Sequence, residues 1–211
     1  MPEPDVAAHL MPSSPADLDA GSTLTGVDLS GAVLSGAELD EVQVEASALE
    51  RMRAAGATWQ HTVLVDCRLD GTDLANLRAP GLSLVRCSLR EVRLVGGQLT
   101  RARLRSVRIE GGAANLTGWQ DATWQHVVLR GCDLREADLT GASLTDVLLQ
   151  DCDLTGAQLS GLRCERVRLS GCRLGGIGGV EGLRGASIGE PDAYELLPAM
   201  ARSLGIRIES A

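Results

Sequence analysis

Six cysteines and three histidines are the residues of this chain best suited to chemistry. Cysteine and histidine bind zinc where four ligands converge on one point, and they act as nucleophile and base where they lie side by side. Here the cysteines recur at intervals of twenty residues instead, as Cys67 and Cys87, and again as Cys132, Cys152 and Cys172. This spacing predicts thiols stacked along one wall of the fold, which do not converge. We therefore expect no metal site and reduced, buried thiols.

Catalysis and a bound cofactor are not expected either. No carboxylate cluster accompanies His61 or His126, no Ser or Cys stands in a Gly-framed turn, and no glycine loop suits phosphate. The two histidines lie in near-identical segments, residues 57–64 and 122–129. Each Trp-Gln-His is either a binding spot on a projecting loop or the product of a duplication whose Trp fills a widened coil. Since Trp is wider than Leu, we expect these coils to bulge or open. Residues 46–55 have a composition compatible with a small helical excursion.

The elements that position these residues are set by a five-residue repeat. Every fifth residue from Leu24 to Leu174 is apolar, 31 positions in all, of which 22 are leucine. This spacing does not fit one face of an α-helix, because each step of five residues turns by about 140°. Nor does it fit a strand, whose side chains alternate with a period of two. The chain is therefore expected to bend once per five residues and to keep each leucine directed at a common axis.

The residue two positions before each of these central residues is mostly small. Between Ser22 and Leu174 there are 36 charged residues, and none falls on the 62 positions of the two sets. Because an unpaired buried charge is costly, this exclusion predicts a narrow, dry core. Glycine often follows two residues after the central leucine, as at Gly26 and Gly31, where a corner needs permissive backbone angles.

Segments such as residues 29–39 (Leu-Ser-Gly-Ala-Val-Leu-Ser-Gly-Ala-Glu-Leu) and 137–144 (Ala-Asp-Leu-Thr-Gly-Ala-Ser-Leu) resemble the pentapeptide-repeat family. The resemblance covers residues 20–176 and implies an all-β fold, a right-handed quadrilateral parallel β-helix with four pentapeptides per coil. Seven to eight coils would make a rod about 35 Å long. The domains expected are a disordered, proline-rich tail at residues 1–20, the β-helix at residues 21–189 and a C-terminal segment at residues 190–211.

The C-terminal segment is expected to be a short helix. It would begin near Pro191, kink or split at Pro198 and stop at Gly205, and residues 206–208 are compatible with a short strand. The helix is expected to cover the open edge of the last coil, and it also suits pairing with a second copy across a two-fold axis as a homodimer. Its apolar face would comprise Leu197, Met200, Ala201 and Leu204.

The net charge of −8 is distributed in bands along the repeat. The first acidic band comprises Asp28, Glu38, Asp40, Glu41 and Glu45. An Arg belt follows over residues 78–110, from which we select Arg93, Arg103, Arg105 and Arg108. The second acidic band comprises Asp133, Asp138, Asp146, Asp151 and Asp153. We predict that these bands form the interaction surface, although solubility also accounts for each charge taken singly.

Three functions stay open. We expect a non-catalytic module, a rigid rod whose banded surface docks on a protein partner by charge complementarity. The resemblance implies an alternative, because members of the family protect DNA gyrase, a type II topoisomerase, from quinolones by mimicking DNA. However, a net charge of −8 over about 35 Å gives a linear charge density several-fold lower than that of duplex DNA, which carries about one charge per 1.7 Å. The middle of the rod is also basic. Direct binding of nucleic acid through the Arg belt is the second alternative and is not expected, because the belt lacks interleaved aromatic residues.

Targeting signals are not expected in this chain. No stretch approaches 18 apolar residues, and the first 20 residues have neither a basic start nor an apolar run. We therefore expect a cytoplasmic protein without a membrane span or a signal peptide.

Overall fold

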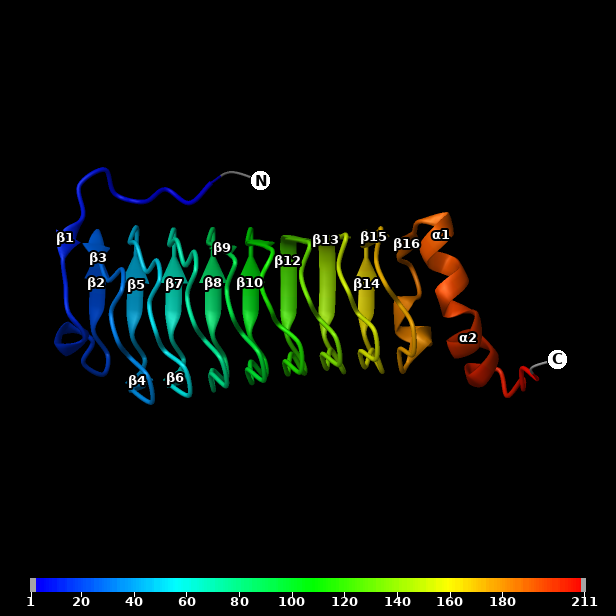
Figure 1. Ribbon diagram of the computed structural model, residues 1–211. Helices are drawn as coiled ribbons and strands as arrows, with labels where there is room; N and C mark the ends of the chain where they lie inside the picture. Colours follow the sequence, from blue (N-terminus) through cyan, green and yellow to red (C-terminus); the bar gives the residue numbers. More distant parts are fainter. Residues whose placement is uncertain (1–2, 210–211) are drawn as a thin grey trace.

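The computed structural model describes residues 3–209, which form an elongated β-solenoid of about nine turns with a short helical segment at its C-terminal end (Figure 1). The parallel β-helical fold expected from the repeat is confirmed. The rod has more turns than the seven to eight expected, because the chain keeps winding after residue 175. Ile177 is buried, and β16 (Ser187–Ile188) pairs in parallel with β15 (Arg168–Ser170) as part of a further turn.

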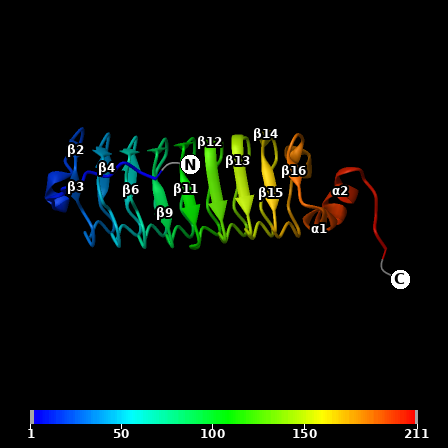
Figure 2. The same cartoon turned by 90° about the horizontal axis from the view of Figure 1, so that it is seen from above.

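Each coil contributes short strands that stack on those of the next coil, as the view from above shows (Figure 2). The strands of the first half are β1 (Met11–Pro12), β2 (Thr23–Thr25), β3 (Val27–Asp28), β4 (Glu38–Asp40), β5 (Gln43–Glu45), β6 (Thr58–Gln60), β7 (Val63–Val65), β8 (Ser83–Val85) and β9 (Ser88–Arg90). Those of the second half are β10 (Arg103–Arg105), β11 (Arg108–Glu110), β12 (Thr123–Arg130), β13 (Ser143–Gln150), β14 (Arg163–Glu165), β15 and β16.

Residues that pair between stacked strands are twenty positions apart in the sequence. Leu24 pairs with Val44, Val44 with Leu64, and Leu64 with Leu84, always in parallel. Four pentapeptides thus bring the chain round once, so residues that are twenty apart in sequence lie one above the other. This relationship decides which charges become neighbours on the outside of the rod.

The interior is filled by the two apolar sets of the repeat. Leu84 and Leu139 are 3% and 2% exposed, and the small residues Ala102 and Cys132 are also buried. Among the described residues, Asp192 is the one charged side chain that is buried, and it belongs to the C-terminal segment. The expected exclusion of charge from the core of the rod is therefore confirmed.

The corners of the coils adopt positive φ, as expected for Gly26 at +66°. Residues other than glycine adopt the same conformation at other corners, including Leu116 at +60° and His61 at +50°. Such a φ is unfavourable for a residue with a Cβ atom, so the stacked coils on either side must hold these corners in place.

The tryptophans lie inside the rod, and the coils that contain them neither bulge nor open. Trp59, Trp119 and Trp124 are at most 2% exposed, and the strands around Trp124 keep the parallel register. Alanines at nearby central positions, Ala79 and Ala114, leave room for the indole rings. Trp119 and Trp124 pack edge to face, with ring centroids 5.1 Å apart. The prediction of a widened coil was wrong, and so was that of a projecting Trp-Gln-His binding spot.

Residues 46–55 form an ordinary coil rather than a helical excursion. Leu49, Met52 and Ala54 take the inward positions of the repeat and are at most 3% exposed. Helix propensity is a weak preference that burial in a stacked coil overrides.

The N-terminal segment follows the rod instead of leading away from it (Figures 1 and 2). A 3-10 helix, η1 (Pro15–Asp17), is followed by the buried Leu18, which belongs to the core cluster. Before it, β1 pairs in parallel with β3, and Glu3 reaches Arg90. The prolines in this segment predict disorder, whereas the structure gives residues 3–20 a defined path.

The C-terminal segment consists of α1 (Glu190–Ala193), η3 (Tyr194–Leu196) and α2 (Leu197–Ser203), so the helix is split just before Pro198. Its buried apolar side chains are Leu196 and Ala199, each 5% exposed. Gly205 ends the segment with a φ of +72°. The strand thought compatible with residues 206–208 is not present, because this stretch pairs with no part of the rod among the described residues.

Candidate interaction surface

The first acidic band surrounds the rod and forms no single patch. Asp28 lies on β3, Glu38 and Asp40 lie on β4 in a different sheet, Glu41 occupies a corner, and Glu45 lies on β5. All but Glu45 are exposed. A hydrogen bond from Ser30 lowers the pKa of the Asp28 carboxyl. These carboxylates share one stretch of the axis of the rod but point in several directions.

The second acidic band is arranged in the same way. Asp133 and Asp153 are bridge partners in adjacent coils, so their side chains share one side of the rod. Asp138 belongs to a different ladder, and Asp146 and Asp151 occupy corners at φ of +55° and +54°. Only one pair of these five residues is therefore brought into contact by stacking.

Three carboxylates of the second band are engaged by arginines, one of them being Asp153, whose Oδ2 lies 3.6 Å from Arg173 Nη1. Asp133 accepts hydrogen bonds from the Arg135 guanidinium at 2.8 and 2.7 Å, which lower the pKa of the carboxyl. The Arg166 guanidinium likewise lowers the pKa of Asp146. Asp133 and Asp146 stay ionised under mildly acidic conditions, but their charge is partly cancelled for any partner.

Arg103 and Arg105 are the members of the Arg belt most available to a partner. Both project from β10, on either side of the buried Leu104, and both are exposed. Neither guanidinium pairs with a carboxylate of residues 3–209. The residues in register with them on β8 and β12 are uncharged: Ser83, Val85, Thr123 and Gln125. These strands therefore present a polar, largely neutral side of the rod with one concentrated pair of positive charges.

The other selected arginines of the belt are already engaged. Arg93 lies on another side and contacts Asp73, with Nη1 3.1 Å from Oδ1. Arg108 on β11 contacts Glu3 of the N-terminal segment, with Nη1 2.6 Å from Oε1. The four selected arginines are thus divided by the fold into Arg103 and Arg105, which have no ion pair within residues 3–209, and Arg93 and Arg108, which contact carboxylates.

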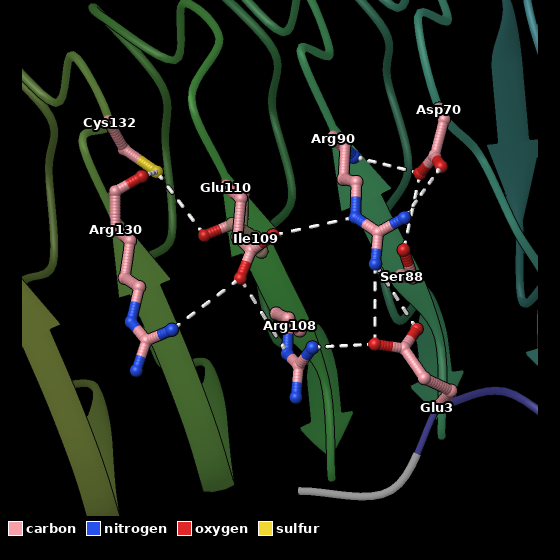
Figure 3. A network of polar contacts seen from close by, with 9 residues as sticks. All are labelled: Glu3, Asp70, Ser88, Arg90, Arg108, Ile109, Glu110, Arg130 and Cys132. Atoms are coloured by element: carbon pink, nitrogen blue, oxygen red, sulfur yellow. Dashed lines mark hydrogen bonds and ion pairs between the residues drawn. The ribbon is translucent and has the colours of Figure 1, made fainter.

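A charged network links successive coils on the side of the rod that carries β9 and β11 (Figure 3). Asp70 Oδ1 accepts the backbone N–H of Arg90 at 3.0 Å and the Ser88 hydroxyl at 3.2 Å. The Arg90 side chain lies between Asp70, 3.7 Å away, and Glu110, 3.4 Å away. Glu110 in turn lies 3.8 Å from Arg130. Because the four charged residues are spaced by twenty, stacking places their opposite charges in alternation.

Glu3 completes this network from outside the rod. Its Oε1 lies 3.2 Å from Arg90 Nη2 and 2.6 Å from Arg108 Nη1 (Figure 3). The Glu3 side chain is 56% exposed, whereas that of Arg108 is 22% exposed. We call the two guanidiniums together with Glu3 the Arg90/Arg108 site.

Sequence reasoning missed a second basic band near the C-terminal end. It comprises Arg163, Arg166, Arg168 and Arg173, opposed within the same coil by Glu165. The cluster is visible in the sequence, and counting charges in blocks of twenty residues would have found it. The contacts of Glu3 had no signal, because they join residues 87 and 105 positions apart.

The thiols and imidazoles offer no reactive arrangement. The thiols are unpaired, and all are buried except the half-buried Cys164. Burial raises the pKa of Cys164 to about 11 and that of Cys87 well above its usual range, so both stay protonated at neutral pH. His61 lies 3.8 Å from Asp40 and His126 lies 3.6 Å from Asp146, both on the exposed surface. Within residues 3–209 no group of three His, Cys, Asp or Glu residues is placed to hold a metal ion.

Two hollows lie at the C-terminal end of the rod. One, of about 440 Å³, lies along β15 and β16 and is lined by residues that include Arg166, Arg168 and Ser187. Another, of about 350 Å³, lies between η2 (Val180–Leu183) and α2 and is lined by Leu183, Leu196 and Met200. Neither brings together groups suited to acid–base or nucleophilic chemistry. No helix within the described residues is long and apolar enough to cross a bilayer.

The fold and the surface define a parallel β-solenoid with an apolar interior and with its charged residues, apart from Asp192 among those described, on the outside. The family model described as pentapeptide repeats matches in eight copies over residues 20–51, 67–105, 120–151 and 137–176. The chain therefore belongs to the pentapeptide-repeat family. No functionally curated protein matches its sequence significantly.

Solved structures with a similar fold share little sequence with this chain. HetL, a pentapeptide repeat protein involved in heterocyst differentiation regulation in the cyanobacterium Nostoc sp. strain PCC 7120, is 20% identical over 80% of this chain and 87% of its own, with a TM-score of 0.36. QnrB1, a plasmid-mediated fluoroquinolone resistance protein, is 18% identical over 89% and 100%, also at 0.36. Rfr23 from the cyanobacterium Cyanothece 51142 is 16% identical over 81% and 90%, at 0.20.

Proposed function

We propose that this protein is a non-catalytic interaction module, a rigid rod that docks on a protein partner through its banded exterior. The observation that supports it most is the Arg103 and Arg105 pair, two exposed and unpaired charges on a neutral side of the rod. Stacked coils hold the backbone of both residues at a fixed spacing, so docking against matching carboxylates would order the two side chains without ordering the backbone.

A filled interior supports a binding role over catalysis. Enzymes place their reacting groups in a concave site that excludes water. Here the axis of the rod is occupied by residues such as Leu104 and Trp124, both at most 1% exposed. The outward residues are therefore the ones left to recognise anything.

DNA mimicry directed at gyrase is the alternative. The two acidic bands support it, and the basic middle opposes it, because a basic DNA-binding surface would repel Arg103 and Arg105. With about nine turns the rod is about 43 Å long, so −8 is still several-fold below the charge density of a duplex. A gyrase supercoiling and cleavage assay with purified protein tests it, and no effect at micromolar protein would count against it.

Self-association through the C-terminal segment is a second proposal. Leu197, Met200 and Leu204 on α2 are 55%, 46% and 72% exposed, and Ile206 and Ile208 beyond it are exposed as well. Leu196 and Ala199 are the residues that cover the last coil, which leaves the predicted apolar face free. A continuous exposed apolar strip of this kind suits a two-fold contact with a second copy.

Affinity capture from the source cell with the full chain tests the proposed module. We expect the wild-type rod to retain a partner that the R103E/R105E variant loses. The matched control is R51E/R53E, which reverses the same number of exposed arginines in an earlier coil and should keep the partner. A DNA mimic would behave differently, because reversal of Arg103 and Arg105 would leave its inhibition of gyrase equal or stronger. Equal capture by the wild type and R103E/R105E would refute docking through this pair.

A further inference from the structure

The N-terminal segment follows one edge of the rod and is bonded to each coil that it passes. Met11 donates its N–H to the carbonyl of Gly26 at 2.8 Å, and Ala7 donates to the carbonyl of Ala46 at 3.0 Å. Gly26 and Ala46 are corner residues twenty positions apart, so these acceptors lie in one row along the axis. The segment thus runs along the rod, bonded to main-chain atoms that any extended peptide can use.

Where the segment reaches the middle of the rod, its contacts involve side chains of the rod instead of main-chain carbonyls. The Asp5 N–H donates to Asp66 Oδ1 at 3.3 Å, in the next coil after Ala46. Glu3 then reaches both guanidiniums of the Arg90/Arg108 site, one coil and two coils further along. Recognition there depends on charge, because a carboxylate rather than a main-chain group fills the site.

The charges of the network balance only when an acidic residue is added from outside. The rod itself supplies the guanidiniums of Arg90, Arg108 and Arg130 against the carboxylates of Asp70 and Glu110. Glu3 is the third carboxylate. Without it, Arg90 and Arg108 would each lose a carboxylate that they contact, beside a row of main-chain acceptors.

We propose that this edge of the rod is a docking site for an extended acidic segment of a protein partner, and that the chain's own N-terminal segment occupies the site until the partner displaces it. The proposal rests on the proposed function and specifies the kind of partner that binds at the edge with the Arg90/Arg108 site. The partner segment needs a carboxylate at the Arg90/Arg108 site and an extended backbone along the row of Gly26 and Ala46.

An acidic peptide fits the site better than a nucleic acid. The occupant in the structure is a carboxylate, and Asp70 and Glu110 next to the two arginines would repel a chain of phosphates. Main-chain carbonyls at the corner accept hydrogen bonds from peptide N–H groups, which a phosphodiester backbone lacks.

A labelled peptide with the sequence of residues 1–12 is the probe, and its binding is followed by fluorescence anisotropy. The full-length E3A/D5A variant has its own segment weakened, so we expect it to bind the peptide. Wild-type protein should bind it about threefold to tenfold more weakly, because a tethered competitor acts at about millimolar effective concentration. A peptide carrying Glu3→Gln should lose most of its binding to E3A/D5A.

The site itself is tested by adding R90Q and R108Q to the E3A/D5A variant. We expect peptide affinity to fall at least tenfold, with far-UV circular dichroism confirming that the rod is retained. The control adds R51Q and R53Q to E3A/D5A, which lie outside the path and should leave binding unchanged. The proposal would be overturned if the wild-type protein and E3A/D5A bound the peptide equally well. It would also be overturned if E3A/D5A bound the Glu3→Gln peptide as well as the unchanged peptide.

Two further outcomes distinguish this proposal from nucleic-acid binding at the same site and from the proposed function. A labelled single-stranded DNA that binds E3A/D5A through Arg90 and Arg108, where the peptide does not, would overturn the acidic-peptide assignment. If the peptide fails while affinity capture still yields a partner dependent on Arg103 and Arg105, this inference falls and the proposed function stands.

Discussion

The carboxylate of Glu195 accepts the backbone N–H of Leu174 at 2.6 Å, in the place where each preceding coil uses a carbonyl of the next one. Leu154, one coil earlier, donates to the carbonyl of Arg173 at 2.9 Å. Asp192 of the same segment accepts the N–H of Cys172 at 3.0 Å. The C-terminal segment therefore ends the stack by supplying acceptors as well as by covering the core, which keeps the edge from pairing with another chain.

Removal of one of these acceptors is expected to destabilise the rod. Glu195→Ala leaves the N–H of Leu174 without its partner, and we expect a loss of about 1–3 kcal/mol in the free energy of unfolding. Urea denaturation followed by circular dichroism measures it. Glu190→Ala, which removes an exposed carboxylate of the same segment, serves as control and should have little effect. Equal stability of the two variants would show that Glu195 does not cap the stack.

The tryptophans of the core differ in how their indole N–H groups are satisfied. Trp119 Nε1 donates to Thr117 Oγ1 at 2.9 Å, whereas Trp124 Nε1 has no hydrogen-bond partner among the described residues. We expect Trp119→Phe to cost about 1 kcal/mol more stability than Trp124→Phe, because only the former loses a hydrogen bond. Chemical denaturation of both variants measures the difference. A larger loss for Trp124→Phe would contradict the hydrogen-bonding assignment.

Acid is expected to weaken the rod through carboxylates paired with arginine. Hydrogen bonds from Arg86 lower the pKa of Asp66, and those from Arg135 lower that of Asp133. A lowered folded-state pKa adds stability above the unfolded value of about 3.9, and that stability is lost as the pH falls through the folded value. We therefore expect the contribution of these two pairs to the free energy of unfolding to be constant between pH 7 and about 5. It should decrease as the pH falls below about 4.

The D66N/D133N variant is expected to show a shallower decline in acid, measured by urea unfolding from pH 7 to pH 3. Asp121→Asn is the control, because this exposed corner aspartate makes no ion pair within the described residues. It should leave the slope unchanged. Parallel curves for wild type and D66N/D133N would contradict a contribution from these two pairs.

Self-association is expected to depend on the exposed side of α2. Leu197→Glu and Leu204→Glu place charges on that strip while Leu196 and Ala199 stay against the last coil. We expect the double variant to sediment as a monomer at concentrations where the wild type sediments as a dimer. The control is Met11→Glu, which charges an exposed apolar residue at the opposite end. A monomeric wild type at high micromolar concentration would rule the dimer out.

Stacking geometry explains why the fold followed so directly from the sequence. Positions such as Leu84 and Leu139 repeat in every coil, so the spacing of five residues states the same geometric requirement about thirty times. The site followed less well, because outward residues carry no such constraint. Arg103 and Arg93 are ten residues apart, yet they face different sides of the rod.

Contacts between segments far apart in the chain could not be predicted from the sequence. Glu3 and Arg108 meet because the N-terminal segment doubles back along the axis, and no local pattern encodes that path. The shape of the coil around Trp59 was misjudged for a related reason. Its width was compared with a single leucine position, whereas the coil above it contributes Ala79 and makes room.

The most direct test of the account is the salt dependence of binding between the captured partner and the purified rod. We predict that the affinity of the wild type falls steeply as KCl is raised, and that R103E/R105E binds at least tenfold more weakly at low salt, where screening is least. R51E/R53E should follow the wild-type curve. Affinity that is insensitive to salt and equal for the wild type and R103E/R105E would contradict docking through the charged exterior of the rod.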